Sequence, residues 1–197
     1  MLRNQLRPAI ALTFILIVIT GLIYPGIVTG LAQALFPRQA NGSLVEAKGH
    51  VVGSSLIGQQ FSSAAYFHPR PSAAGSGYVG DSSSGTNKGP TDRKLADTLI
   101  AQAVDSAVKN DGAIKGQIPA DMVTSSGSGL DPDISPANAG LQVARVAKAR
   151  NIPPERVREL VADHTENRQL GLFGEPRVNV LVLNLALDSM FAAPHNH

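Results

Sequence analysis

The chain has 197 residues, with 17 Lys and Arg against 15 Asp and Glu, and a formal net charge of +2. Arg3 and Arg7 carry this excess, so the chain beyond residue 37 is formally neutral and lacks the electrostatic footprint of a nucleic-acid-binding domain. There is no cysteine, which excludes disulfides, thiol catalysis and thiolate metal sites. The 19 glycines and 13 prolines, with no tryptophan, predict one loop-rich domain with a modest core.

The first long feature of the chain is an uncharged stretch, residues 8–37, which is almost wholly apolar from Ala9 to Tyr24. About 20 apolar residues in a helix cover a hydrocarbon core of roughly 30 Å, and a helix satisfies its own backbone there. Residues 9–35 therefore predict a transmembrane anchor helix, kinked or ended near Pro25 because proline removes a backbone donor. The candidates for packing against neighbouring membrane helices are small residues and this proline: Gly21, Pro25, Gly26 and Gly30.

The charges beside this stretch predict its orientation. Arg3 and Arg7 flank one end closely, and a single arginine lies as near to the other. Positive charge concentrates on the cytoplasmic side, so residues 1–8 are predicted to be cytoplasmic and residues 36–190 to lie beyond the membrane. A cleaved signal peptide is the alternative, with Ala32-Gln33-Ala34 as its small-residue cleavage pattern, and it exports the same domain.

Beyond the anchor, extended segments and loops give way to helices with a 3.6-residue apolar period. The predicted order is extended chain with turns over 41–61, a long loop over 66–90, a helix over 91–109, a loop or short helix over 118–128, helices over 136–149 and 153–164, and a central strand running into a short helix over 178–187. Residues 191–197 are predicted to be a flexible tail. The expected fold class is a single N-terminal transmembrane helix plus one loop-rich mixed α/β (α+β) extracytoplasmic domain, residues 36–190.

Local residues mark where the predicted helices begin and end. Thr91 or Asp92 is predicted to cap the first helix of the domain, and Gly112 to end it. Ser135 before Pro136 is a good N-cap and first-turn pair for the second helix. The predicted buried stripes of the second and third helices are Val143, Val146 and Ala147, and Val157, Leu160 and Val161.

Motifs of catalytic and cofactor-binding proteins are absent or out of context. Residues 75–80 match G-x-G-x-x-G, but no strand precedes them and no helix follows within a dinucleotide-binding unit. Residues 106–109 match S-x-x-K without the companion motifs of penicillin-recognising enzymes. No Walker A, G-x-S-x-G or H-E-x-x-H sequence occurs. His195 and His197 are a weak metal-binding pattern, and we expect this chain to have no metal site of its own.

The most distinctive polar cluster, residues 123–136, is rich in glycine and serine and precedes a helix start. Its backbone N–H groups could form a nest for an anion or a partner, and a turn-rich segment held by Asx and Ser/Thr caps is the alternative. The following helix adds Gln142, Arg145, Lys148 and Arg150. The favoured interpretation of these four side chains is a solvated basic face.

A series of short motifs runs along nearly the whole chain: LRPA at 6–9 with an anchor that ends at Tyr24-Pro25, residues 36–37 and 39–44, GSSLIGQ at 53–59, YFHPRPS at 66–72, SGTNKGP at 84–90, VTSSGSGLD at 123–131, RVAKAR at 145–150 and RVNVLVLNLALD at 177–188. In this order they resemble the C subunit of the bacterial Kdp potassium-transporting P-type ATPase, the KdpC family. That family keeps its N-terminal helix, so the resemblance implies a retained single-pass anchor in the bacterial inner (cytoplasmic) membrane.

The resemblance implies an accessory subunit of a high-affinity, ATP-driven potassium uptake complex, needed for its assembly and without catalysis of its own. The implied partners are a channel-like potassium-binding subunit, a P-type ATP-hydrolysing subunit, a small membrane peptide and the lipid bilayer. ATP, potassium and Mg²⁺ are used by the complex, and none is expected to bind this chain alone.

The family is described as a catalytic chaperone that raises the ATP affinity of the hydrolysing subunit. A glutamine at the position of Gln142 is its proposed nucleotide contact. The charge-derived topology instead places Gln142 across the membrane from cytoplasmic ATP.

A different hypothesis follows from the predicted topology: the exported domain caps the extracellular mouth of the channel-like subunit through loops 66–90 and 123–136. The candidate contact residues are Tyr66, Phe67, Arg70, Pro71, Ser72, Asn87, Ser126, Ser128, Asp131 and Arg145. Two alternatives stay open: a membrane-anchored exported solute-binding domain, and a serine hydrolase that uses Ser126 or Ser128 with His164.

Overall fold

The computed structural model describes residues 2–191 of the chain. It divides into two compact units, Met1–Leu44 and Val45–His197. Part of the expected flexible tail, residues 192–197 with His195 and His197, lies outside the described residues.

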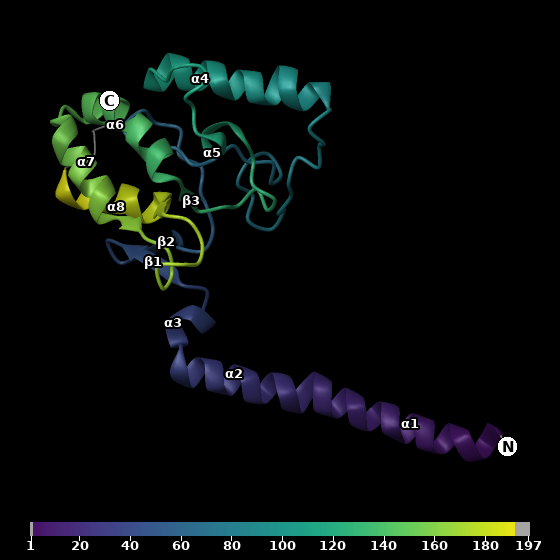
Figure 1. The fold of residues 1–197 in the computed structure, drawn as a ribbon. Coiled ribbons are helices and arrows are strands. Elements are labelled where there is room, and N and C mark those ends of the chain that lie inside the picture. Colours follow the sequence, from purple (N-terminus) through teal and green to yellow (C-terminus); the bar gives the residue numbers. More distant parts are fainter. Residues whose placement is uncertain (1, 192–197) are drawn as a thin grey trace. The chain divides into compact units, whose positions relative to one another are not determined.

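The first unit is helical almost throughout (Figure 1). Helix α1 (Leu2–Val18) continues through a π-helical turn, η1 (Ile19–Ile23), into α2 (Tyr24–Leu35), and α3 (Pro37–Ala40) follows. Among the described residues, one helix, Gln5–Leu35, is long and apolar enough to cross a membrane.

The helix does not end at Pro25, which lies in the first turn of α2. The N–H of Tyr24 bonds to the carbonyl of Ile19, five residues back, and this widened turn comes immediately before the proline. A π-turn is a common way for a helix to accommodate a residue that cannot donate to the usual carbonyl. The expected effect of Pro25 is therefore a local widening of the helix rather than its end.

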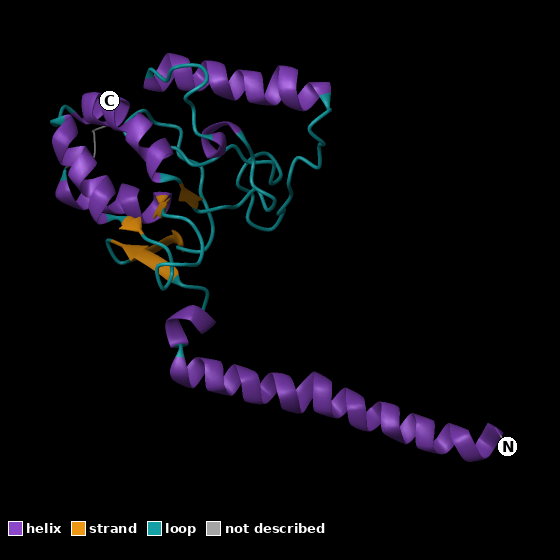
Figure 2. Cartoon of the chain, in the orientation of Figure 1, coloured by secondary structure: helices purple, strands orange, loops and turns teal. Residues whose placement is uncertain are grey.

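The second unit combines helices with two small sheets (Figure 2). Strands β1 (Leu44–Ala47) and β2 (His50–Ser54) form one sheet. The other has the order β3-β5-β4 and is antiparallel, with β3 (Asp133–Ile134), β4 (Thr165–Glu166) and β5 (Arg177–Asn179). Val178 of the central strand lies opposite both Ile134 and Thr165.

The helices of this unit are the π-helical η2 (Leu95–Ile100), α4 (Ala101–Asp111), α5 (Ala120–Val123), α6 (Pro136–Arg150), α7 (Pro154–Asp163) and α8 (Val180–Met190). The predicted caps are confirmed. The carboxylate of Asp92 accepts from the N–H of Leu95, and Ser135 Oγ accepts from the N–H of Asn138. Gly112 ends α4 with a positive φ of 68°, which a residue without a Cβ adopts readily.

The predicted central strand running into a short helix over 178–187 is confirmed, with the helix taking most of the segment. Only Arg177–Asn179 is extended, and α8 takes up the apolar run from Val180. Asn179 causes the change, because its side chain accepts a hydrogen bond from the N–H of Val182 and so caps the helix. A nearly continuous apolar run fits a buried strand or a buried helix equally well.

The hydrophobic core lies where α6, α7 and α8 meet, and Phe67 from the irregular N-terminal part of the unit is fully buried in it. The predicted stripes of α6 and α7 are buried as expected: Val143, Val146, Ala147, Val157, Leu160 and Val161. From α8 the core receives Val180, Leu183 and Leu187. Three helices thus support an extended segment that contributes one large aromatic anchor.

Candidate functional site

The segment around Phe67 is held by two side-chain amides. The N–H of Phe67 donates to Asn184 Oδ1 over 2.9 Å, and Asn184 Nδ2 donates back to the carbonyl of Phe67 over 3.0 Å. Gln142 binds the next residue in the same way. The N–H of His68 donates to Gln142 Oε1 over 2.7 Å, and Gln142 Nε2 donates to the carbonyl of His68 over 3.0 Å. Each amide thus donates to and accepts from the backbone of one residue, as a paired strand does, although within residues 2–191 the segment pairs with no strand.

Two arginines complete the backbone bonding of this segment. Arg145 donates to the carbonyls of Ala64 and Tyr66, each over 2.8 Å, and Arg150 donates to the carbonyl of Ala65 over 2.7 Å. With the two amides, five consecutive carbonyls from Ala64 to His68 accept from side chains of α6 and α8. We call residues 64–68 and these four side chains the backbone cradle.

The arginines of the cradle are themselves paired. Arg145 Nε lies 2.7 Å from Asp111, and both side chains are less than a tenth exposed. Arg150 lies 2.6 Å from Asp188 and stacks over the ring of Tyr66, 4.7 Å from its centroid. The predicted solvated basic face is therefore wrong for Gln142, Arg145 and Arg150, because these three side chains are buried and bond the backbone of residues 64–68.

Loops 66–90 and 123–136 are joined beyond the cradle. Ser84 N donates to Ser128 O over 2.9 Å, and Ser72 Oγ donates to Gly129 O over 2.6 Å. Ser125 Oγ donates to Pro71 O over 2.8 Å. Segment 72–90 contains no helix or strand, yet these bonds fix it against the second loop. We call the two loops together the loop pair.

A charged contact closes the base of the loop pair. Arg70 Nη1 lies 2.8 Å from the carboxylate of Asp131, and the phenol of Tyr78 donates to the carbonyl of Arg70 over 2.6 Å. Burial raises the pKa of Tyr78, and the negative charge of Asp131 adds to this rise. The phenol therefore stays a hydrogen-bond donor at every physiological pH.

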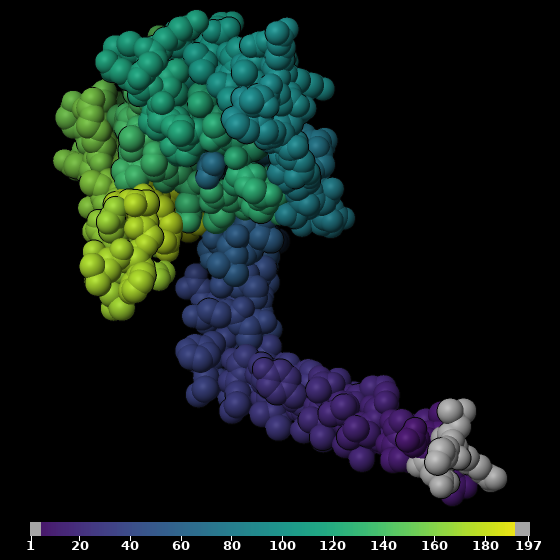
Figure 3. Space-filling view, turned by 45° about the vertical axis from the view of Figure 1, so that its right-hand side comes forward, coloured from purple at the N-terminus to yellow at the C-terminus, as the bar shows by residue number. Residues whose placement is uncertain are grey.

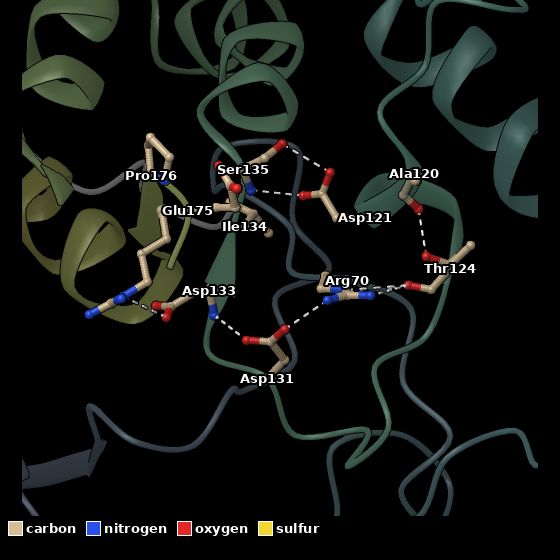
Figure 4. A pocket seen from close by; sticks show the side chains of 11 residues that line it. Arg70, Ala120, Asp121, Thr124, Asp131, Asp133, Ile134, Ser135, Glu175 and Pro176 are labelled. Atoms are coloured by element: carbon tan, nitrogen blue, oxygen red, sulfur yellow. Dashed lines mark hydrogen bonds and ion pairs between the residues drawn. The ribbon is translucent and has the colours of Figure 1, made fainter. Parts of the chain in front are cut away.

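A cavity of about 530 Å³ lies beside this contact (Figure 4). Its acidic side chains are already engaged: Asp121 accepts from Ser135 N, Ser135 Oγ and Asn138 Nδ2 at the start of α6, and Asp131 bonds Arg70. Burial raises the pKa of Asp133, although Arg177 lies 3.2 Å from it and opposes the rise. Among the described residues, no group of three or more acidic or histidine side chains is arranged to hold a metal ion.

A second cavity, of about 550 Å³, is lined by His68, Lys109, Arg145 and Lys148 among others. The ring Nε2 of His68 lies 3.0 Å from the carbonyl of Ser63. Burial lowers the pKa of His68, and the positive charge of Arg145 lowers it further. The ring is therefore neutral at pH 7 in the folded chain.

This lowered pKa predicts how stability depends on pH. The unfolded chain binds a proton at His68 near pH 6.5, whereas the folded chain binds it only at lower pH. The contribution of His68 to stability is therefore complete above about pH 6.5 and is lost as the pH falls through the folded pKa. Thermal unfolding of the full chain between pH 7.5 and about pH 5 should show a smaller loss of stability for His68→Gln than for the wild type. Equal losses would contradict the assignment.

The hydrolase alternative finds no support in the hydrogen bonds of the described residues. Ser126 Oγ accepts from the N–H of Gly129, Ser128 Oγ accepts from the N–H of Leu130, and His164 Nδ1 bonds the carbonyl of Leu160 in its own helix. Neither serine bonds to His164 in this part of the chain. His164 instead lies at the C-terminal end of α7 and bonds a carbonyl of its last turn.

The candidate contact residues divide into two groups. Tyr66, Phe67 and Arg145 take part in the cradle, and Tyr66 and Phe67 also begin loop 66–90. The others lie in the loop pair alone: Arg70, Pro71, Ser72, Asn87, Ser126, Ser128 and Asp131. Asn87 is exposed and Phe67 is fully buried, so only the first offers its side chain to a partner. Sequence reasoning missed Asn184, Asp111 and Asp188, whose partners are far away in the chain.

Fold and site together define a class of protein: a small α+β unit whose polar interior fixes irregular loops, carried by a helix that fits a single-pass membrane anchor. The chain belongs to the KdpC family, described as the c chain of a K⁺-transporting ATPase, and the match covers residues 6–189.

Close relatives extend this match over the whole length. The chain is 64% identical over 190 residues to the potassium-transporting ATPase KdpC subunit of Gemmatimonas aurantiaca, which covers 96% of this chain and 94% of that protein. It is 55% identical over 195 residues to the subunit of the same name from Rhodospirillum rubrum, with 99% of this chain and all of that protein covered. The counterpart in Acidobacterium capsulatum is 56% identical over 187 residues, or 95% and 99% of the two chains.

Proposed function

We propose that this chain is an accessory subunit of an ATP-driven potassium uptake complex, and that its domain caps the outer mouth of the channel-like subunit. The loop pair carries the proposal. Two long irregular loops that are held to each other by backbone and serine bonds form a preorganised contact surface, which loses little entropy on binding.

The charges around the anchor support placing this surface outside the cell. Arg3 and Arg7 precede the apolar helix, and positive charge concentrates on the cytoplasmic side of such helices. Residues from Arg38 onward would then face the outside of the inner membrane. ATP is cytoplasmic, so a direct contact between this domain and the nucleotide would need the opposite orientation.

The anchor has its own candidate contact with the membrane subunits. Gly26 and Gly30 are four residues apart, so they lie on one face of α2, and a Cβ added to either glycine would have no neighbouring atom within 4 Å. Small residues at this spacing let a second helix approach closely within the bilayer. The other two candidates, Gly21 and Pro25, are also four residues apart and lie on a different side of the helix from Gly26 and Gly30.

The bonding of Gln142 supports an indirect effect on ATP affinity. Its oxygen accepts from His68 N and from Arg145, and its nitrogen donates to the carbonyl of His68 and to Asn138. The side chain is 1% exposed, so a nucleotide would have to displace these partners. We infer that Gln142 affects ATP affinity indirectly. It keeps the cradle ordered, and the ordered cradle supports assembly of the complex.

Asn184 provides a matched control for this inference, because it holds Phe67 as Gln142 holds His68. Gln142→Ala and Asn184→Ala should each reduce the amount of purified complex, since each leaves a buried N–H and C=O unpaired at a cost of about 2–4 kcal/mol. The KM for ATP of the complex that does assemble should be unchanged in both variants. A raised KM in Gln142→Ala alone would contradict the indirect role.

Single cysteines test the capping proposal cleanly, because the natural chain has none. Ser82→Cys and Asn87→Cys place a thiol at exposed positions of the loop pair, and Glu159→Cys places one on exposed α7 as a control. In cells treated with a membrane-impermeant bifunctional thiol reagent, we expect the first two to cross-link to cysteines in the outer loops of the channel-like subunit, and the third to remain uncrosslinked.

Two results would contradict the proposal in different ways. Cross-links from residues 82 and 87 to cytoplasmic domains would show that the loop pair faces the wrong subunit. If the impermeant reagent modified Asn4→Cys but none of the three domain cysteines, the orientation itself would be wrong.

A further inference from the structure

One turn of the domain exposes large apolar side chains to solvent. Leu170, Leu172 and Phe173 are 89%, 76% and 63% exposed in the segment between β4 and β5. A scattered exposed leucine is ordinary on a protein surface, but three large apolar residues within four positions form a patch. We call residues 169–174 the apolar tip.

The apolar tip is an ordered turn. Gln169 and Phe173 exchange backbone hydrogen bonds of 2.8 and 2.9 Å, and Arg168 pairs with Glu175 over 2.6 Å at its base. Leu170 adopts a positive φ of 53°, a conformation that glycine or asparagine occupies at lower cost. Leu170 therefore occupies a position that is unfavourable for leucine in two respects, its positive φ and its exposure to water.

Further apolar side chains are exposed at the same end of this unit. Val51, Leu56 and Ile57 lie on or just after β2 and are all exposed. Figures 1 and 3 show the β1–β2 region and the segment before β5 at one end of the second unit, and Asn179 of β5 donates to the carbonyl of Ser55. The apolar tip is thus part of a larger apolar end of the domain.

The chain enters the domain at this same end, at the start of β1. This entry point indicates which surface lies close enough to cover the apolar tip. The unit begins at Val45 in β1, and residues 36–44 alone join it to the apolar helix. Nine residues span at most about 30 Å, so the start of β1 stays within that distance of the C-terminal end of α2. The nearest apolar phase for the exposed side chains is the lipid interface.

We propose that the apolar tip inserts into the outer lipid interface beside the anchor and holds this end of the domain on the membrane. The Arg168–Glu175 pair makes the base of the tip formally neutral, so insertion needs no unpaired charge to leave water. The proposal rests on the membrane anchoring and orientation proposed above, and it is independent of whether the loop pair caps the channel-like subunit.

Depth measurements on the full chain test this insertion. Leu172→Cys carries an environment-sensitive NBD fluorophore, and Glu159→Cys on α7 carries the same label as control, in nanodiscs of phosphatidylethanolamine and phosphatidylglycerol. Interfacial side chains lie roughly 5–10 Å into the headgroup region, so we expect iodide to quench residue 172 at least about threefold less than residue 159. A lipid with a quencher near its headgroup should quench residue 172 more than residue 159.

A double variant distinguishes protection by the apolar tip from an effect of the fluorophore alone. Leu170→Asn with Phe173→Ser removes the other two apolar side chains at exposed positions, where substitution costs little stability. Iodide should then quench residue 172 as strongly as residue 159. Equal quenching at the two positions before this change would overturn the proposal. Protection that arises only when the other subunits are present would also overturn it, and would assign the tip to a protein partner.

Discussion

Replacing Arg145 with alanine should lower the free energy of unfolding by about 3–5 kcal/mol, because it leaves one partner of a buried ion pair uncompensated. Asp111 would keep its charge at 6% exposure, and the carbonyls of Ala64 and Tyr66 would lose their donor. For a domain of this size, a change of 1 kcal/mol shifts Tm by roughly 2–4 °C, so the midpoint should fall by about 10 °C.

Arg158→Ala is the matched control for this prediction. Arg158 also pairs with a carboxylate, that of Glu155, but both side chains are at least 60% exposed. Surface pairs contribute about 0–1 kcal/mol, so its Tm should change by no more than a few degrees. Thermal unfolding of the full chain in detergent, followed by near-ultraviolet circular dichroism, measures both variants. Similar shifts in the two would mean that the cradle is not what stabilises the domain.

Gly129→Ala should separate the two loops of the loop pair. A Cβ on residue 129 would lie 2.5 Å from Ser84 O and 2.7 Å from Ala74 N, and φ is +68° there. Backbone atoms on both sides leave the added methyl no room, so the loops have to move apart. If the loop pair is the contact surface, losing about 1.4 kcal/mol of its binding energy would weaken the contact tenfold. We expect potassium uptake at low external potassium to fall to about a tenth of the wild-type rate or less.

Gly127→Ala, two positions away, distinguishes this effect from a general intolerance of alanine. No atom lies within 4 Å of a Cβ at residue 127, and its φ is not positive. This variant should transport potassium normally. Proteolysis of residues 72–90 in the full chain should accelerate only in Gly129→Ala. Normal uptake by Gly129→Ala despite faster proteolysis would rule out the loop pair as the functional surface.

The helices of the domain could be predicted because the signals that define them are local. Ser135 and Pro136 stand at the start of α6, Gly112 stands after α4, and the apolar period places Val143 and Val157 inside. Strands β3 and β4 could not be predicted in this way. Each has two residues, which is too short to show any alternation.

The cradle could not be predicted because its partners are distant in the sequence. Asn184 and Phe67 are 117 residues apart, and Gln142 and His68 are 74 apart. Charge patterning alone suggested that Arg145 and Arg150 face water. One signal in the sequence indicated that these side chains bond the backbone instead. Prolines at 69 and 71 prevent a helix around the aromatic Phe67. A buried segment without a helix needs hydrogen-bond donors from elsewhere in the chain.

The 117-residue separation between Phe67 and Asn184 also sets the order of events during biosynthesis. At a synthesis rate of about 5–20 residues per second, Phe67 is made roughly 6–23 s before Asn184 of α8, which binds its backbone. Until then the N–H and the carbonyl of Phe67 lack Asn184, and the core around its ring lacks α8. Maturation of this domain is thus a late, all-or-nothing event, and a nascent chain truncated before residue 180 should be a substrate for chaperones and proteases.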